Sequence, residues 1–351
     1  MSGEPEVVVA KRGRLGHLLL NRPKAINALT LGMVDTINEA LQAWAEDDSI
    51  DVVVLSGAGE RGLCAGGDIR TLYDAATTGD YDQAETFWRR EYALDTLVAR
   101  YPKPYVALMD GLVMGGGVGV STHASHRIVT ERTRVGMPEV TIGYTPDVGT
   151  SIILSRAPDE LGTYAALTGT PLNASEAITV GLADTYVPSD RLDRLLELLA
   201  DESVDVALAE VASGADDPPP PRLDAEHIAK TFGHDDMAAV VADLEAADDR
   251  RTLDALGRAA PFSLALTLRA LRNARGFDTV EEALDQDLRL SLALVRRPDF
   301  REGVRAAVID KDRDPKWQPD TLAGVDAAEI DALVTASDQT KRTDPDRREP
   351  R

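Results

Sequence analysis

Two glycine-rich segments, residues 64–70 (CAGGDIR) and 114–119 (MGGGVG), could bind an anionic oxygen through their backbone amides. Glycine lets backbone N–H groups approach a ligand closely, and the second segment lies between a predicted strand and a helical pattern. One amide from each loop, aimed at the same oxygen, would form an oxyanion hole. The alternative is that each loop is only a tight turn or a close helix–strand contact. Neither loop has the spacing of a P-loop or of a dinucleotide-binding motif.

Two carboxylates lie eight positions apart in residues 137–149 (MPEVTIGYTPDVG). Proline and glycine interrupt this segment, so it could fold Glu139 and Asp147 into one pocket. Two carboxyl groups whose surroundings split their pKa values can act as base and acid on a water molecule and a leaving group. The alternative is that Glu139 lies on the surface and Asp147 caps a helix.

Short β-rich runs alternate with helical patterns over about the first 190 residues, and these elements must position the segments above. In the first helical pattern, apolar residues recur at steps of three and four, and Thr30 is suited to cap its start. Strands between helices predict an α/β fold of stacked ββα units rather than an all-helical or all-β fold. Strands are predicted at 7–10, 17–20, 52–55, 105–109, 127–130 and 185–187, and helices at 31–44, 82–99, 149–155 and 191–199.

The composition changes near residue 214 and divides the chain into four predicted parts. Residues 1–213 form the ββα core. Residues 214–224 contain four consecutive prolines and two aspartates and are expected to be a stiff, exposed linker. Residues 225–320 carry three helical patterns and are expected to pack back onto the core. Residues 321–351 are acidic and then mixed in charge, which predicts a largely disordered tail.

The charge of the chain excludes several classes of partner. The chain of 351 residues has 38 basic and 60 acidic side chains, a net charge of −22, which opposes nucleic-acid and membrane binding.

The single cysteine, Cys64, allows no internal disulfide and no cysteine-based zinc cluster, and the five histidines lack metal-ligand spacing, so no metal is expected. No membrane span and no targeting peptide are recognised, so a cytoplasmic location is expected.

These segments, taken together, resemble the crotonase (enoyl-CoA hydratase/isomerase) superfamily. The shared motifs are residues 20–29 (LNRPKAINAL), the two glycine loops and residues 169–184 (GTPLNASEAITVGLAD). Residues 300–312 (FREGVRAAVIDKD) and 315–317 (PKW), with 103–108 (KPYVAL) and the PDVG stretch, are similar to the 3-hydroxyisobutyryl-CoA hydrolase branch. The resemblance covers about residues 5–320. It implies a crotonase-like spiral of stacked ββα units, here followed by a helical C-terminal segment.

The resemblance also implies an oxyanion hole. Backbone amides at the positions of Gly67 and Gly116 bind the thioester oxygen in the superfamily. Hydratases of the superfamily place one catalytic glutamate two residues after the glycine triplet, where this chain has Gly119. Their second glutamate corresponds to Glu139, which is retained. The missing carboxylate argues against water addition to a double bond by the usual two-glutamate route.

The hydrolase branch implies two further site residues. Asp147 occupies a position where hydratases usually carry glycine, and Glu91 corresponds to a substrate-contacting carboxylate. Glu91, Gly116, Glu139 and Asp147 are therefore expected to contact the acyl group, with Glu139 as general base or nucleophile. Glu91 could instead be an exposed helix carboxylate. The expected reaction is hydrolysis of the thioester of 3-hydroxyisobutyryl-CoA in valine breakdown; 3-hydroxypropionyl-CoA could also be a substrate.

Coenzyme A would enter as part of the substrate, so no separate cofactor is expected. Arg22 and Lys24 are the first candidates for its phosphates, and simple solvent exposure is their alternative. The full set expected to contact coenzyme A is Arg22, Lys24, Ala25, Ala65, Gly66, Gly67, Asp68 and Ile69.

Two other functions stay open at this point: an enoyl-CoA hydratase or isomerase, and a non-catalytic CoA-binding protein with the same fold. The oligomeric state is open too. Relatives are commonly trimers or hexamers, so a homo-oligomer is one option, but the helical C-terminal segment could cover the surface that those assemblies use.

Overall fold

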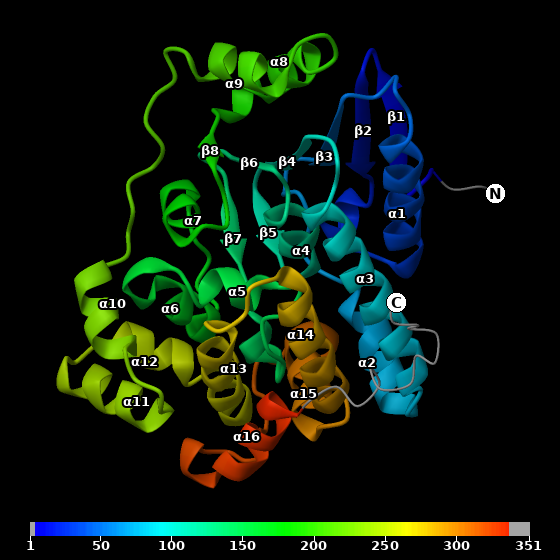
Figure 1. Cartoon of the computed structure of the whole chain (residues 1–351). Helices are drawn as coiled ribbons and strands as arrows, with labels where there is room; N and C mark the ends of the chain where they lie inside the picture. The colour runs from blue at the N-terminus through cyan, green and yellow to red at the C-terminus, as the bar shows by residue number, and fades with distance from the viewer. Residues whose placement is uncertain (1–3, 337–351) are drawn as a thin grey trace, which may run out of the picture.

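The computed structural model describes residues 4–336, and its central element is a six-stranded sheet (Figure 1). The strand order is β1-β2-β3-β4-β6-β8, and every neighbouring pair is parallel except β1 with β2. A second, two-stranded parallel sheet pairs β5 with β7. The strands are β1 (Val7–Arg12), β2 (Leu15–Leu20), β3 (Val52–Gly57), β4 (Tyr105–Met109), β5 (Leu112–Met114), β6 (His126–Val129), β7 (Arg134–Gly136) and β8 (Thr185–Tyr186).

The central strands are buried on both faces, which explains their continuous apolar sequence. In β3, Val53 and Leu55 belong to the main core, whereas Val52 and Val54 pack with a smaller core beneath helices α8 (Leu192–Leu198) and α9 (Val204–Ala212). Successive side chains of a strand point to opposite faces, so a strand covered by helices on both sides needs β-branched or aliphatic residues at every position.

Helices of the first half surround this sheet. Helix α1 begins where predicted, with the Thr30 side chain accepting a hydrogen bond from the amide of Met33 at 3.2 Å. The helices are α1 (Leu31–Ala45), α2 (Ile69–Thr78), α3 (Tyr81–Ala99), α4 (Gly116–Thr122), α5 (Thr150–Leu154), α6 (Leu161–Thr168), α7 (Ala174–Val180), α8 (Leu192–Leu198) and α9 (Val204–Ala212), with 3₁₀ turns η1 (Pro23–Ala25), η2 (Glu139–Ile142), η3 (Pro158–Glu160) and η4 (Ser189–Arg191).

An extended segment joins the two halves and is attached to α7. The side chains of Asn173 and Ser175 donate hydrogen bonds to the carbonyls of Pro220 (2.8 Å) and Pro219 (2.6 Å), respectively. Arg222 forms an ion pair with the buried Glu176 at 2.6 Å. This segment runs along the outside of the molecule from α9 to α10 (Figure 1).

The second half is helical, and α14 packs along α3 while α13 contacts α5 and α6. Residues 225–260 form three helices, because Asp236 and Asp249 each cap the start of a new one. The elements are α10 (Ala225–Phe232), α11 (Met237–Ala246), α12 (Arg250–Leu256), α13 (Pro261–Ala274), α14 (Val280–Leu294), α15 (Pro298–Val304), the π-helical η5 (Arg305–Ile309), the 3₁₀ turn η6 (Leu322–Gly324) and α16 (Ala327–Thr335).

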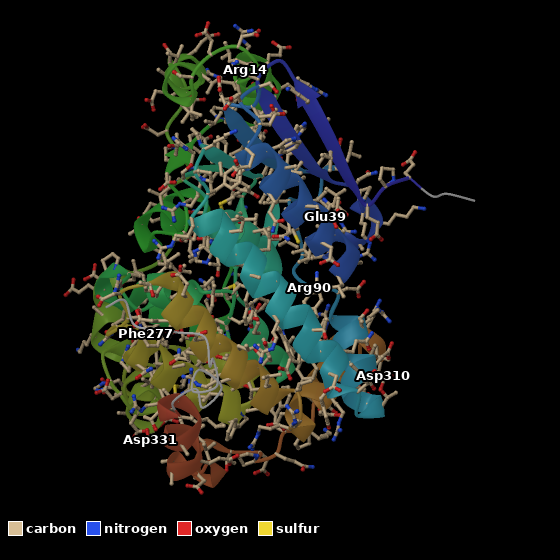
Figure 2. The ribbon with its side chains drawn as sticks, turned by 45° about the vertical axis from the view of Figure 1, so that its right-hand side comes forward. Arg14, Glu39, Arg90, Phe277, Asp310 and Asp331 are labelled. Atoms are coloured by element: carbon tan, nitrogen blue, oxygen red, sulfur yellow. The ribbon has the colours of Figure 1, made fainter. Side chains whose placement is uncertain are left out.

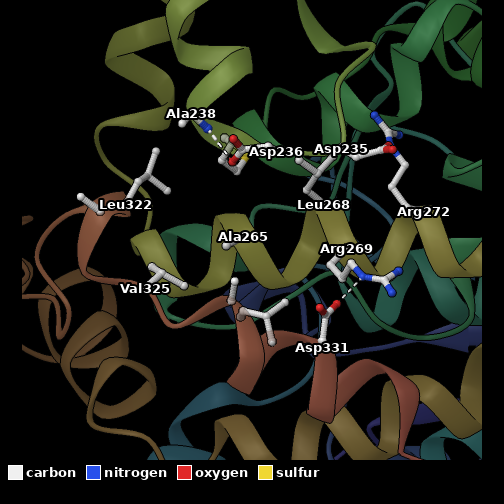
Figure 3. Close-up of a pocket in the computed structure, with 14 residues that line it drawn as sticks. Asp235, Asp236, Ala238, Ala265, Leu268, Arg269, Arg272, Leu322, Val325 and Asp331 are labelled. Carbon is white, nitrogen blue, oxygen red and sulfur yellow. Dashed lines mark hydrogen bonds and ion pairs between the residues drawn. The ribbon is translucent and has the colours of Figure 1, made fainter.

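The prediction of a largely disordered tail over residues 321–351 is wrong for the part that the structure describes. Helix α16 packs on α13 and α14, burying Ile330 and Val334. Arg269 and Asp331 form an ion pair at 2.7 Å beside a groove of about 560 Å³ (Figure 3). The acidic composition concealed two apolar residues four positions apart, which is a helical spacing. Residues 337–351 lie outside the described residues.

We expect Ile330→Ala to destabilise the protein by about 2–4 kcal/mol, because it leaves a cavity between α16 and α13. Denaturant unfolding followed by circular dichroism measures this loss. Ala332→Ser, at an exposed position of the same helix, is the control and should change the free energy of unfolding by less than about 0.5 kcal/mol. Equal stability of the two variants would contradict the packing of α16.

Candidate functional site

A cavity of about 150 Å³ lies between α3, the two glycine loops and the segment that begins at η2. It collects residues from five separate parts of the first half of the chain. No Lys, Arg or His side chain is among its described lining. The lining residues are Ala65, Gly66, Gly67, Ile69, Leu72, Phe87, Trp88, Glu91, Met114, Gly115, Gly116, Pro138, Glu139, Thr141, Ile142, Tyr144 and Asp147.

The two glycine loops are in direct contact. A Cβ atom on Gly116 would lie 3.3 Å from the nitrogen of Gly67, and one on Gly66 would lie 3.7 Å from the nitrogen of Gly116. Gly115 has φ 47° and ψ −124°, a conformation open only to glycine. Within residues 4–336, the amides of Gly67 and Gly116 donate no hydrogen bond to another residue. Both are therefore available to one ligand oxygen.

The carboxyl group of Glu139 stands against this pair of loops. Its Oε1 atom would lie 3.0 Å from a Cβ on Gly115, and its Oε2 atom has no hydrogen-bond partner among the described residues. Glu139 opens η2, whose glycine C-cap, Gly143, turns the chain so that Asp147 returns to the same cavity.

Hydroxyl groups hold Asp147 in place. Its Oδ2 atom accepts a hydrogen bond from the Tyr92 hydroxyl at 2.7 Å and one from the Tyr144 hydroxyl at 3.2 Å. Both tyrosine hydroxyls also contact the hydroxyl of Ser291, which lies on α14. The C-terminal helical segment thus supports a carboxylate that belongs to the first half of the chain.

Glu91 projects into the cavity from α3. Its neighbour Arg90 points to the outer surface (Figure 2), where it pairs with Asp35 at 2.8 Å. Glu91 is 2% exposed, and its Oε1 atom has no described partner. A Cβ on Gly116 would collide with that oxygen, so Glu91 reaches the mouth of the proposed oxyanion hole.

Five buried carboxyl groups lie in or beside the cavity, and burial opposes charge on each of them. Burial raises the pKa of Asp147 to about 6, although its hydroxyl donors limit the rise. Burial, and then the charge of Asp147, raises the pKa of both Glu139 and Glu91 well above the usual range. Burial likewise raises the pKa of Asp95 and Asp287. Burial therefore favours the neutral form of each group, and at Asp147 the two hydroxyl donors oppose this effect.

Four of the eight residues expected to contact coenzyme A line the cavity, and the other four, Arg22, Lys24, Ala25 and Asp68, do not. Ala65, Gly66, Gly67 and Ile69 line the cavity. The charge of Arg22 is offset within the protein, because it pairs with Glu6 at 3.1 Å and Asp68 at 3.2 Å. Lys24 and Ala25 are exposed and lie outside the lining.

Sequence reasoning did not single out the aromatic residues of the site. Phe87 and Trp88 line the cavity from α3, and the Trp88 ring stacks on Tyr144 with centroids 5.8 Å apart. Phe87, Trp88, Glu91 and Tyr92 share one face of α3 at helical spacing, a pattern that was visible in the sequence. The contact with Ser291 had no such signal, because it joins residues about 200 positions apart.

The described residues show no reactive cysteine, no metal-ligand cluster and no membrane-spanning helix. Cys64 is buried, and burial raises the pKa of its thiol to about 12, so it is not a reactive thiol. Among residues 4–336, no group of three or more His, Cys, Asp or Glu side chains is placed to hold a metal ion. The helices of that same range are each too short or too polar to cross a membrane.

Asp147→Asn should change how stability depends on pH. Because the pKa of Asp147 in the folded protein, about 6, lies above 3.8, its ionisation destabilises the fold as pH rises through that range. Relative to this variant, the wild type should lose up to about 3 kcal/mol of unfolding free energy between pH 4 and pH 7.5. Urea unfolding across this pH range measures the difference.

The matched control is Asp82→Asn, which removes an exposed carboxyl group from the first turn of α3. It should follow the wild-type pH dependence. If Asp147→Asn followed it as well, Asp147 would not be a carboxyl group that burial keeps from ionising.

The chain matches the model of the enoyl-CoA hydratase/isomerase family over residues 15–334. A Danio rerio protein named 3-hydroxyisobutyryl-CoA hydrolase, mitochondrial, is 38% identical over 348 residues, which cover 95% of this chain and 90% of that protein. The Homo sapiens protein of the same name is 38% identical over 333 residues, covering 91% of this chain and 86% of that one.

Solved structures share the architecture. The crystal structure of a carnitinyl-CoA dehydratase from Mycobacterium thermoresistibile has a TM-score of 0.90 and 44% identity, covering 95% of this chain and 97% of that one. An enoyl-CoA hydratase from Rhodobacter sphaeroides has a TM-score of 0.87 and 38% identity, covering 94% and 97%, respectively. The predicted α/β crotonase fold is confirmed.

Proposed function

Because the chain belongs to the enoyl-CoA hydratase/isomerase family, we propose that it is an acyl-CoA thioester hydrolase that cleaves 3-hydroxyisobutyryl-CoA. The products are 3-hydroxyisobutyrate and free coenzyme A, a step of valine breakdown. The names of the relatives from Danio rerio and Homo sapiens support this reaction. The reaction as written consumes only water and the thioester, so we propose that it requires no cofactor beyond the coenzyme A of the substrate.

One observation carries the proposal: the cavity has a pair of acids, Glu139 and Asp147, but no side chain at the position of the hydratase glutamate. A Cβ on Gly119 would lie 2.7 Å from the Cβ of Val148 and 2.8 Å from Asp95 Oδ1, so the surroundings leave no room for a side chain there. Water addition by two glutamates therefore lacks one of its groups.

The acid pair offers one carboxylate and one carboxylic acid, which are the two forms that hydrolysis uses. The thioester oxygen accepts hydrogen bonds from the amides of Gly67 and Gly116 as negative charge develops on it. A carboxylate of the pair either takes a proton from the attacking water, or attacks the carbonyl carbon to form a mixed anhydride that water then hydrolyses to the hydroxy acid and the free carboxylate. The protonated member supplies the proton that the departing sulfur needs. Glu91 binds the polar end of the acyl group.

The size of the cavity favours a short acyl group. A volume of about 150 Å³, lined in part by the rings of Phe87, Trp88 and Tyr144, suits an acyl chain of a few carbons. 3-Hydroxypropionyl-CoA lacks one methyl group, a difference worth about 1–3 kcal/mol, so we propose it as a second and poorer substrate.

A second candidate is dehydration or hydration of an acyl-CoA, because the similar Mycobacterium thermoresistibile protein is named a carnitinyl-CoA dehydratase. The crowding at Gly119 opposes it in this chain. A third candidate, CoA binding without catalysis, is opposed by the three acids gathered in the cavity.

The partners, the location and the oligomeric state of the protein are proposals or predictions. We propose a small-molecule acyl-CoA substrate as its partner, with no nucleic acid and no membrane. The relatives from Danio rerio and Homo sapiens are named mitochondrial. The cytoplasmic location expected for this chain remains a prediction, and so does a homo-oligomer.

Mixing the protein with 3-hydroxyisobutyryl-CoA and a thiol reagent tests the function through release of coenzyme A. Glu139→Gln keeps the shape of the side chain but cannot exchange the proton, so kcat should fall by at least about 100-fold. The control is Glu39→Gln on the outer surface of α1 (Figure 2), which should keep the wild-type rate. Hydration of crotonyl-CoA without thiol release would contradict the hydrolase proposal.

Tyr92→Phe should move the acid limb of kcat/KM to higher pH. The Tyr92 hydroxyl stabilises ionised Asp147, so its loss raises the pKa of Asp147 above about 6, by about one unit. Tyr144→Phe should cause a smaller shift, because its hydroxyl is 3.2 Å rather than 2.7 Å from the carboxylate. If neither variant shifted the acid limb of kcat/KM, Asp147 would not be the group that controls it.

A further inference from the structure

A serine from the C-terminal helical segment lies behind the acid pair. Ser291 is fully buried on α14, and its hydroxyl contacts those of both Tyr92 (2.9 Å) and Tyr144. Its own proton is directed elsewhere, because Ser291 donates to the backbone carbonyl of Asp287 at 2.7 Å. With that proton in use, the Ser291 oxygen acts toward the tyrosines as an acceptor only.

Each tyrosine hydroxyl of this network has two possible acceptors for its single proton. Tyr92 and Tyr144 each have one hydroxyl proton, and each can donate it either to Asp147 Oδ2 or to Ser291 Oγ. When Asp147 is ionised, donation to the carboxylate is favoured because it is a charge-assisted hydrogen bond. When Asp147 is protonated, it becomes a donor itself, and a tyrosine proton needs another acceptor. Ser291 supplies that acceptor.

We propose that Ser291 is a positioning residue that lets the hydroxyls of Tyr92 and Tyr144 follow the charge of Asp147. The inference rests on the proposed function, in which a carboxylate of the acid pair gains and loses a proton in each turnover. Both charge states of Asp147 then keep a complete set of hydrogen bonds, without movement of the backbone. A buried network with a missing acceptor would favour one state over the other.

Burial has the largest effect on the pKa of Asp147, and the hydrogen bonds from Tyr92 and Tyr144 oppose it. Helix α3 presents Glu91 and Asp95, and the segment after η2 presents Glu139. Burial raises the pKa of each of these three carboxyl groups well above its usual range, so burial favours their neutral forms.

Asp287, on helix α14, is connected to Asp147 through the loop that follows Asp147. Asp287 Oδ2 accepts a hydrogen bond from the Gly149 amide at 2.8 Å, which fixes the loop that follows Asp147. Arg289, on the same helix, favours the charge of Asp287 but is not among the groups that shift Asp147. Among the described residues that line the cavity, none carries a positive charge.

Ser291→Ala tests the proposal in the ligand-free protein, with the Asp147 carboxyl carbon followed by ¹³C NMR as pH changes. Without Ser291, both tyrosine protons have only the carboxylate as acceptor, so ionised Asp147 is favoured. The pH at which Asp147 ionises should therefore fall below the wild-type value by about one unit. This is the opposite direction from that expected for Tyr92→Phe, and the acid limb of kcat/KM should move the same way.

Two controls separate this role from a loss of packing. Ser263→Ala removes another buried serine, on α13, whose hydroxyl has no described partner; it should leave the ionisation of Asp147 unchanged. In a Tyr92→Phe/Tyr144→Phe background, Ser291→Ala should cause no further shift, because no tyrosine proton remains to redirect.

The proposal would be overturned if Ser291→Ala raised the pH at which Asp147 ionises or left it unchanged. It would also be overturned if Ser291→Ala caused an equal shift in the Tyr92→Phe/Tyr144→Phe background. The NMR measurement uses no substrate. If the wild type released no coenzyme A while the predicted NMR shifts were observed, the proposed function would fail and the hydrogen-bond network would stand.

Discussion

Contact between two glycine loops is the feature on which the rest of the site depends. Residues 64–67 and 114–117 approach so closely that a Cβ atom on Gly117 would lie 2.6 Å from the Cβ of Cys64, so a side chain there would disturb the arrangement. This contact leaves two backbone amides without partners among the described residues, on one side of a small cavity. A ligand oxygen placed between them would be held by rigid donors, which do not have to reorganise as charge develops. The sheet and α4 fix the positions of both loops.

The opposite side of the cavity is acidic, and burial opposes charge on its carboxyl groups, with no cation among the described lining to offset it. Because each additional negative charge would be buried beside another, the carboxyl groups hold their protons unless local donors stabilise the anion. Asp147 has two hydroxyl donors, which limit the rise of its pKa to about 6, whereas burial raises the pKa of Glu139 well above the usual range. One fold thus provides both forms of carboxyl group in the same small space.

Much of the fold could be predicted from the sequence, and less of the site. The strands predicted at 7–10, 17–20, 52–55 and 105–109 and the helices predicted at 31–44 and 82–99 are confirmed to within a few residues. The position of Gly119 already pointed away from hydration. Helix α16 was missed because its acidic composition concealed a short apolar pattern. The tyrosine–serine network was missed because hydrogen bonds between distant segments leave no local pattern. The charge of Arg22 could not be assessed either, since its partners Glu6 and Asp68 meet only in the folded protein.

A crystal structure of the Glu139→Gln variant with bound 3-hydroxyisobutyryl-CoA would test the account most directly. The account predicts that the thioester oxygen lies about 3 Å from the nitrogens of both Gly67 and Gly116, with residue 139 beside the carbonyl carbon. A thioester oxygen directed away from these two amides, with the acyl group bound elsewhere, would contradict it.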